Sequence, residues 1–220
     1  MKPAFYALER GGWRDYVTLL HPPYTLWHLS YVALGAGLAP RLDGPRLGAT
    51  FAAFGLALGI GAHALDELRG RPLRTEIPAP VLVGLAVASI AGAAAIGIAV
   101  AVSFSLWLLA FVAVGSFLVV AYNLELPGFH TDLWFGLAWG GFPVLTAYFA
   151  MAGRLRGEAV VAAASATLLS LAQRTLSTPV REARRRSGDA SILAPAERAL
   201  RLLTVATAAL GGALLLRHLR

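Results

Sequence analysis

The chain has 220 residues, of which 57% are hydrophobic and 14% are charged, and it contains no cysteine. A soluble domain usually carries about 25% charged residues, so this composition indicates a single domain embedded in a membrane. Without cysteine there is no disulfide, no thiolate metal site and no cysteine nucleophile. The net charge of +7 does not indicate a nucleic-acid partner, because the arginines lie between apolar blocks and lack aromatic interleaving.

Apolar segments long enough to cross a bilayer follow one another along the whole chain. About 20 apolar residues form one helical span, and residues 77–124 contain no Asp, Glu, Lys, Arg or His, which predicts two spans joined near Ser103. An open β-sheet leaves its backbone unsatisfied in lipid, so the spans are expected to be helices. The predicted all-α bundle has about seven transmembrane helices, at residues 16–40, 47–69, 79–101, 104–123, 133–153, 157–177 and 197–217.

The basic residues indicate an orientation. With the N-terminus inside, most Lys and Arg residues lie in predicted cytoplasmic loops, so we expect a cytoplasmic N-terminus and a C-terminus on the opposite side of the cell membrane. Residues 174–201 would form the longest inner loop, with Arg184, Arg185 and Arg186 near its middle. These arginines either lie on anionic headgroups or serve only to set the topology.

Glycines are concentrated in two of the predicted spans. Gly55, Gly59 and Gly61 belong to the second span, and residues 136, 140 and 141 of the fifth span are also glycines. In lipid, glycine lets helix backbones approach closely. We therefore expect tight helix packing at both places.

Ionisable residues gather at the predicted cytoplasmic end. His63, Asp66 and Glu67 have i, i+3 and i+4 spacing, which places them on one helix face. Ionisable groups at membrane depth usually face the bundle interior or a water-filled cavity. We therefore expect a polar cavity that faces the cytoplasm. Its other candidate members are His21, His28, Glu125, His130 and Asp132.

This cluster has two interpretations. Histidines and carboxylates on facing helices suit a divalent metal, and the candidate ligands are His63, Asp66, Glu67, Glu125, His130 and Asp132. In the other interpretation, Asp66 and Glu67 form interfacial salt bridges with Arg69, Arg71 or Arg74. His28, which Trp27 and Tyr31 flank, is expected to be a packed and hydrogen-bonded histidine instead.

Several motifs resemble those of the UbiA superfamily of intramembrane aromatic prenyltransferases. The first span opens with residues 19–25, Leu-Leu-His-Pro-Pro-Tyr-Thr, which is similar to the family's Arg-Pro start of its first helix. The polar stretch 63–67 is followed by Arg71-Pro72-Leu73, where the family has an Asn-Asp-x-x-Asp-x-x-x-Asp motif and often Arg-Pro-Leu. Tyr122-Asn123, Pro127 and His130 have a spacing like that of the family's Tyr-Ser, Pro and Lys. The resemblance covers about residues 16–190.

The resemblance implies an active site that faces the cytoplasm and a prenyl diphosphate substrate bound through Mg²⁺. Asp66, Glu67 and His63 would then be the catalytic residues. The substrate-binding residues would be Arg71, Arg74, Tyr122, Asn123, His130, Arg174 and Arg181. The chain departs from the family in having fewer spans and fewer acids, because residues 173–182, where the family's second acidic motif is expected, contain one acid. Arginine can hold phosphate without a metal.

Three functions therefore stay open. The first is a UbiA-like transferase that acts on an isoprenoid or related lipid. The second is a lipid-modifying enzyme with iron, manganese or zinc in the histidine and carboxylate site. The third is a non-catalytic lipid-binding or assembly protein. Membrane lipids and an isoprenoid-like small molecule are the expected partners, and no protein partner is indicated.

Overall fold

The computed structural model describes residues 3–186 and 190–219, and within these ranges all regular structure is helical. A short helix α1 (Trp13–Leu19) precedes α2 (Pro22–Leu38). Three segments then continue into one another as a single long helix: α3 (Gly44–Phe54), the π-helix η1 (Gly55–Ala62) and α4 (His63–Leu68). The helices α5 (Ala79–Ser103) and α6 (Leu108–Asn123) follow.

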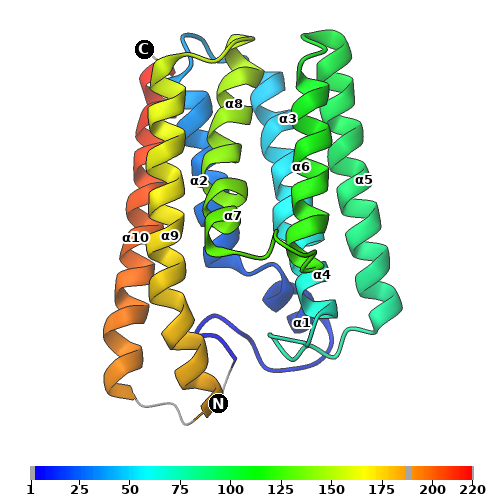
Figure 1. The fold of residues 1–220 in the computed structure, drawn as a ribbon, viewed down its shortest axis with the longest axis vertical. Helices are drawn as coiled ribbons and strands as arrows, with labels where there is room; N and C mark the ends of the chain where they lie inside the picture. Colours follow the sequence, from blue (N-terminus) through cyan, green and yellow to red (C-terminus); the bar gives the residue numbers. More distant parts are fainter. Residues whose placement is uncertain (1–2, 187–189, 220) are drawn as a thin grey trace.

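The second half of the chain repeats the pattern of a helix with a π-helical centre. Here α7 (Asp132–Gly136), η2 (Leu137–Gly141) and α8 (Phe142–Ala152) are continuous. The chain ends with α9 (Gly157–Arg186), α10 (Ala190–Leu216) and a 3₁₀ turn, η3 (Arg217–Leu219). Figure 1 shows the long helices side by side, with α9 and α10 at one edge of the bundle and α5 at the other.

Five described helical segments are long and apolar enough to cross a membrane: Gly44–Leu68, Ala79–Ser103, Asp132–Ala152, Gly157–Arg184 and Leu193–Leu219. The helix α6 is apolar but shorter. On α5, Val83, Val87 and Val102 are exposed, as expected of a helix whose outer face contacts lipid. The chain is therefore an all-helical membrane protein.

The first long helix begins later than residue 16, where the sequence predicted its start. His21 adopts a left-handed backbone conformation with φ of 44°, and this separates α1 from α2. Pro22 and Pro23 then occupy the first turn of α2, where a missing N–H is tolerated. The turn places His21 at the lower end of the bundle, beside the N-terminal segment.

The predicted long inner loop at residues 174–201 is wrong, because α9 extends to Arg186 and α10 begins at Ala190. These helix ends pack together through Val180, Leu193 and Leu200, and Arg184 forms an ion pair with Glu197. These apolar contacts stabilise the ends of α9 and α10 as helices, beyond the segments that the sequence predicted as spans. The predicted headgroup contacts of Arg185 and Arg186 lie outside the described side chains.

Close approaches of backbone hold the bundle together. A Cβ on Gly35 of α2 would lie 2.2 Å from the carbonyl oxygen of Val144 in α8. A Cβ on Gly140 of η2 would lie 2.5 Å from the carbonyl oxygen of Ala166 in α9. The expected tight packing is thus present at Gly140, and also in the second predicted span, where a Cβ on Gly61 would lie 2.9 Å from Ile90 Cγ1. A Cβ on Gly55 would meet nothing within 4 Å.

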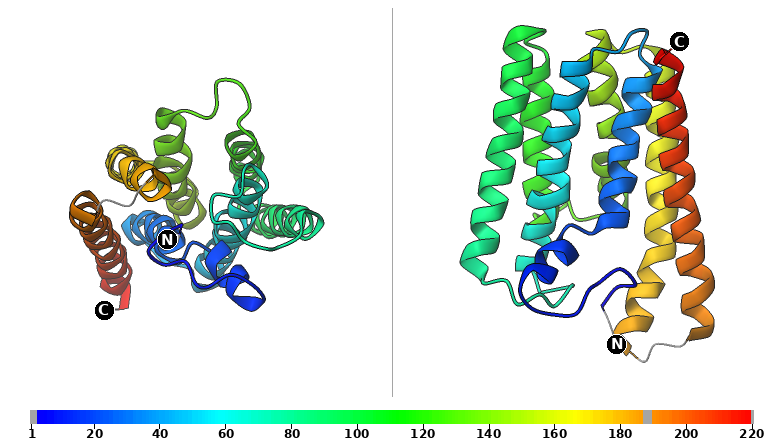
Figure 2. Two further views of the ribbon diagram at one scale, coloured as in Figure 1. Left: turned by 90° about the horizontal axis from the view of Figure 1, so that it is seen from below. Right: turned by 180° about the vertical axis from the view of Figure 1, so that it is seen from behind.

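The N-terminal segment closes the lower end of the bundle. Seen from below in Figure 2, it passes across the ends of the helices. The buried carboxylate of Asp15 fixes it, because this group accepts hydrogen bonds from Gly11 N at 3.1 Å and from Glu76 N at 2.7 Å. The backbone N–H of Leu8 also donates to Thr18 Oγ1 at 3.0 Å. The N-terminal segment is therefore a folded part of the lower end of the bundle.

Candidate active-site cavity

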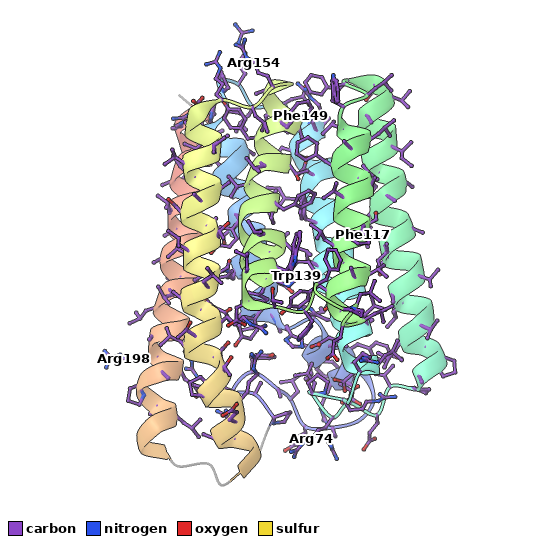
Figure 3. All side chains as sticks on the ribbon, viewed as in Figure 1. Arg74, Phe117, Trp139, Phe149, Arg154 and Arg198 are labelled. Atoms are coloured by element: carbon purple, nitrogen blue, oxygen red, sulfur yellow. The ribbon has the colours of Figure 1, made fainter. Side chains whose placement is uncertain are left out.

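A cavity of about 620 Å³ opens among the lower ends of the helices, above the N-terminal segment. Figure 3 shows the polar side chains that gather there, below Trp139 and above Arg74. Ten of the twelve residues that the sequence predicted as catalytic, substrate-binding or metal-binding line this one cavity: His63, Asp66, Arg71, Arg74, Tyr122, Asn123, Glu125, His130, Arg174 and Arg181. The predicted cavity members His21 and His28 line it too. The structure thus brings together side chains from α4, α6, α9 and the loops between helices.

Three histidines in the cavity wall have a defined orientation. The Nδ1 atom of His28 lies 2.9 Å from the carbonyl oxygen of Trp139, and that of His63 lies 3.2 Å from the oxygen of Gly59. The Nδ1 atom of His130 lies 2.9 Å from the oxygen of Tyr122. A carbonyl oxygen only accepts hydrogen bonds, so each Nδ1 carries the proton, and Nε2 of the neutral ring is an acceptor. The expectation that His28 is packed and hydrogen-bonded is confirmed.

His21 completes the group of histidines. Its ring stacks on that of His63 with the centroids 4.1 Å apart, and its Nδ1 lies 2.8 Å from the hydroxyl of Tyr6. Burial lowers the pKa of His21 well below its ordinary value, and the neighbouring His63 and Arg181 lower it further. His21 is therefore neutral at pH 7 and offers a hydrogen-bonding surface without charge.

Asp66 is the carboxylate that faces the cavity without a partner. It is half-buried in α4 and lines the cavity. No side chain or backbone group among residues 3–186 and 190–219 forms a hydrogen bond or an ion pair with its carboxylate oxygens. A carboxylate in this state is available to a ligand.

Glu67, the next residue, faces a different way. Its carboxylate is fully buried and accepts hydrogen bonds from Leu73 N at 2.9 Å, Thr75 N at 2.8 Å and Thr75 Oγ1 at 2.9 Å. It is not part of the cavity lining. Glu67 therefore fixes the loop that follows α4, and this use of its lone pairs leaves little capacity for a metal or substrate.

The other predicted acids are occupied by arginines. Glu125 accepts a hydrogen bond of 2.9 Å from Arg69, and this bond holds the pKa of Glu125 below its ordinary value. Asp132 lies outside the cavity lining and forms an ion pair with Arg174. The described part of the chain shows no salt bridge from Asp66 or Glu67 to Arg69, Arg71 or Arg74. Arg69 pairs with Glu125 instead.

Two of the predicted substrate-binding arginines, Arg71 and Arg174, form hydrogen bonds within the protein. Arg71 donates to the carbonyl oxygens of Thr75 at 3.3 Å and Ile77 at 2.6 Å, which closes the loop after α4. Arg174, besides its pair with Asp132, donates to the hydroxyl of Tyr122 at 2.6 Å. Both line the cavity, but their geometry is fixed by these contacts.

The donor set fits a magnesium or transition-metal centre poorly. Of the six predicted ligands, Glu67 is held by loop contacts and Glu125 and Asp132 by ion pairs, which leaves Asp66 and the Nε2 atoms of His63 and His130. Within the described residues no group of three His, Asp or Glu side chains converges as metal ligands. Bundle-core di-metal sites use several converging carboxylates, so no chemical step is assigned to a metal here.

A second, smaller cavity of about 100 Å³ lies higher in the bundle. Its walls are largely apolar side chains of α3, η1, α5, α6, η2 and α8, including Phe54, Phe111 and Phe142. Leu58 of η1 and Trp139 of η2 line both this cavity and the polar one. Leu58 and Trp139 therefore lie between a polar and an apolar space, and both belong to π-helical segments, which are frequent at functional sites.

Sequence reasoning missed several residues that line the polar cavity. Phe5 and Tyr6 come from the N-terminal segment, and Tyr24, Gln173 and Ser177 come from α2 and α9. Gln173 is buried, and its Oε1 atom has no hydrogen-bond partner in the described structure. The one signal in the sequence was the polarity of the segment around Gln173.

Comparison with known proteins found no match for this chain among protein-family models, curated proteins or solved structures.

Proposed function

We propose that this chain is a UbiA-like membrane transferase that acts on an isoprenoid or related lipid in the polar cavity. The proposal includes seven membrane crossings, with α2 and α6 completing the five long apolar segments, and a cavity that faces the cytoplasm. The observation that carries it is the junction of the two cavities at Leu58 and Trp139.

This junction suits an amphiphilic substrate. A charged head would lie in the polar cavity among arginines, histidines and Asp66, while the hydrocarbon chain would pass Leu58 and Trp139 into the apolar cavity. Ligand sites commonly combine apolar walls with a few polar groups that fix orientation. A purely structural scaffold has no need for an unpaired carboxylate in a space of about 620 Å³.

The proposed reaction transfers a prenyl group from its diphosphate to an acceptor. The bond between the prenyl carbon and the diphosphate oxygen breaks, and the diphosphate leaves with the electron pair. The acceptor forms a new bond to that carbon and loses one proton. The carboxylate of Asp66 stabilises the developing positive charge, and Nε2 of His63 accepts the proton, since its Nδ1–H is already committed to Gly59.

A transfer assay tests this function. Protein in lipid nanodiscs is incubated with radiolabelled geranyl diphosphate and a panel of hydroxylated aromatic and lipid acceptors. We expect a labelled lipid product with the wild type and at least about a hundredfold less with Asp66→Asn, a loss typical of removing electrostatic stabilisation. Glu182→Gln, at an exposed site on α9, is the matched control and should keep full activity. No product from any acceptor would favour a non-catalytic lipid-binding protein instead.

A further inference from the structure

The polar cavity carries an excess of positive charge. Its lining includes the guanidinium groups of Arg69, Arg71, Arg74, Arg174, Arg181 and Arg184 and the carboxylates of Asp66, Glu125 and Glu197. Low-dielectric walls strengthen the field of such an excess and concentrate anions. The lining therefore selects a negatively charged ligand.

Most of these arginines are already engaged. Arg69 pairs with Glu125, and Arg184 pairs with Glu197. As described above, contacts within the protein also hold Arg71 and Arg174. Arg181 and Arg74 remain as the cavity arginines that have no acidic partner in residues 3–186 and 190–219.

The charge of Arg181 acts on other residues of the cavity lining. Burial raises the pKa of Tyr6 well above its ordinary value, and Arg181 opposes this effect. Arg181 also contributes to the lowered pKa of His21, after burial and His63. Within residues 3–186 and 190–219, the one hydrogen bond of its side chain runs from Nη2 to Thr178 Oγ1 at 3.3 Å. Most of the five guanidinium donors of this side chain thus remain available beside the wall of Tyr6 and His21.

Arg74 lies at the cavity mouth. It is exposed, with a left-handed φ of 57°, and Figure 3 shows it at the lower edge of the molecule. No hydrogen bond involving its side chain is present in the described structure. Arg74 and Arg181 are both exposed residues of the cavity lining, so both can meet an anion that enters.

We propose that the cavity binds a phosphate or diphosphate head group by direct contact with the guanidinium of Arg181, assisted by Arg74, and not through a magnesium ion held by carboxylates. The planar guanidinium pairs with phosphate oxygens through two parallel hydrogen bonds. Asp66 is the single unpaired carboxylate in the lining, so guanidinium charge outweighs carboxylate charge around the head group. The assignment of this head group to a lipid rests on the proposed function.

Direct binding measurements test the assignment without turnover. Isothermal titration calorimetry on protein in nanodiscs uses geranyl diphosphate and inorganic pyrophosphate as probes, each in EDTA and in Mg²⁺. We expect geranyl diphosphate to bind in EDTA, and pyrophosphate to bind more weakly. Arg181→Gln should weaken binding of both probes at least about tenfold, as expected for loss of a charge-assisted pair. Arg74→Gln should weaken both probes less.

The matched control is Arg154→Gln, because Arg154 is an exposed arginine at the opposite end of the bundle (Figure 3). It should leave both affinities unchanged. Arg181→Lys keeps the positive charge but lacks the planar guanidinium, so it should bind both probes more tightly than Arg181→Gln does. If Arg181→Gln does not fold, Arg181→Lys is compared with the wild type in its place.

Three results would overturn the assignment. The first is equal affinity of the Arg181 variants and the Arg154 variant, which would place the anion elsewhere. The second is binding that disappears in EDTA and returns with Mg²⁺, which would assign the head group to a metal. The third is equal affinity for the two probes, which would make the ligand a free anion and not a lipid. If the transfer assay gives no product but geranyl diphosphate still binds in EDTA, only the transferase function is overturned.

Discussion

The imidazole ring of His21 lies face to face with that of His63, with centroids 4.1 Å apart and planes inclined by 17°. His21 comes from the turn before α2, and His63 is the first residue of α4. The pair therefore joins the N-terminal part of the chain to the helix that carries Asp66. Two stacked rings tolerate a shared positive charge poorly, so the stack requires neutral histidines.

This stack predicts a loss of stability in mild acid. The pKa of His21 is lower in the folded protein than its ordinary value of about 6.5. The unfolded chain therefore binds the proton more readily, and stability is complete above about pH 6.5 and falls as the pH decreases below it. Thermal unfolding in detergent between pH 8 and pH 5 should show the decrease, and His21→Gln should reduce it.

The control for this measurement is His218→Gln, because His218 lies in η3, after the end of α10, where its Nε2 lies 2.9 Å from the carbonyl oxygen of Gly37. That variant should keep the acid sensitivity of the wild type. An equally steep pH dependence in His21→Gln would show that the sensitivity arises elsewhere.

Glu67 should prove to be a structural residue. Glu67→Ala removes the acceptor of three buried hydrogen bonds from Leu73 and Thr75, and each unsatisfied buried donor costs about 1–3 kcal/mol. We expect the free energy of unfolding to fall by about 3 kcal/mol or more. Chemical denaturation in detergent measures it, with the exposed Glu182→Ala as the control. A variant with normal stability but no ligand binding would instead place Glu67 in the site.

Gly35 tests the packing of α2 on α8. A Cβ at this position would lie 2.2 Å from the carbonyl oxygen of Val144, so Gly35→Ala must separate the two helices. Overpacking of this kind typically costs about 1–3 kcal/mol, and the melting temperature should fall. Gly84→Ala is the matched control, because its Cβ would meet nothing within 4 Å on the exposed face of α5. Equal melting temperatures for the two variants would contradict the observed helix contact.

Part of this structure could be predicted from the pattern of apolar residues, because lipid imposes helices and a minimum length on any span. The long helices lie close to the predicted ranges, except at the start of α2 and where α9 and α10 extend toward each other. The predicted sixth span contains the polar residues Ser165, Thr167 and Gln173, and the segment Gly157–Arg184 is nevertheless among the apolar ones. Gln173 is instead buried toward the cavity.

The details of the site could not be predicted, since they depend on pairs far apart in the sequence. The partner of Asp132 is Arg174, and the partner of Glu125 is Arg69. Glu67 shares a helix face with His63 by spacing, but α4 ends at Leu68 and the chain folds back over Glu67. Local spacing cannot reveal such a return of the chain. The functional roles of the residues that do line the cavity stay predictions.

Single-cysteine labelling tests the lipid-binding cavity most directly, because the chain has no native cysteine. Ser177→Cys would place a thiol in the cavity wall, and Glu182→Cys would place one at an exposed site near the cavity end of the same helix. We predict that a water-soluble thiol reagent modifies both thiols and that geranyl diphosphate slows the reaction at position 177 at least about tenfold, without affecting position 182. A thiol at 177 that never reacts, or one that reacts at the same rate with and without geranyl diphosphate, would contradict the account.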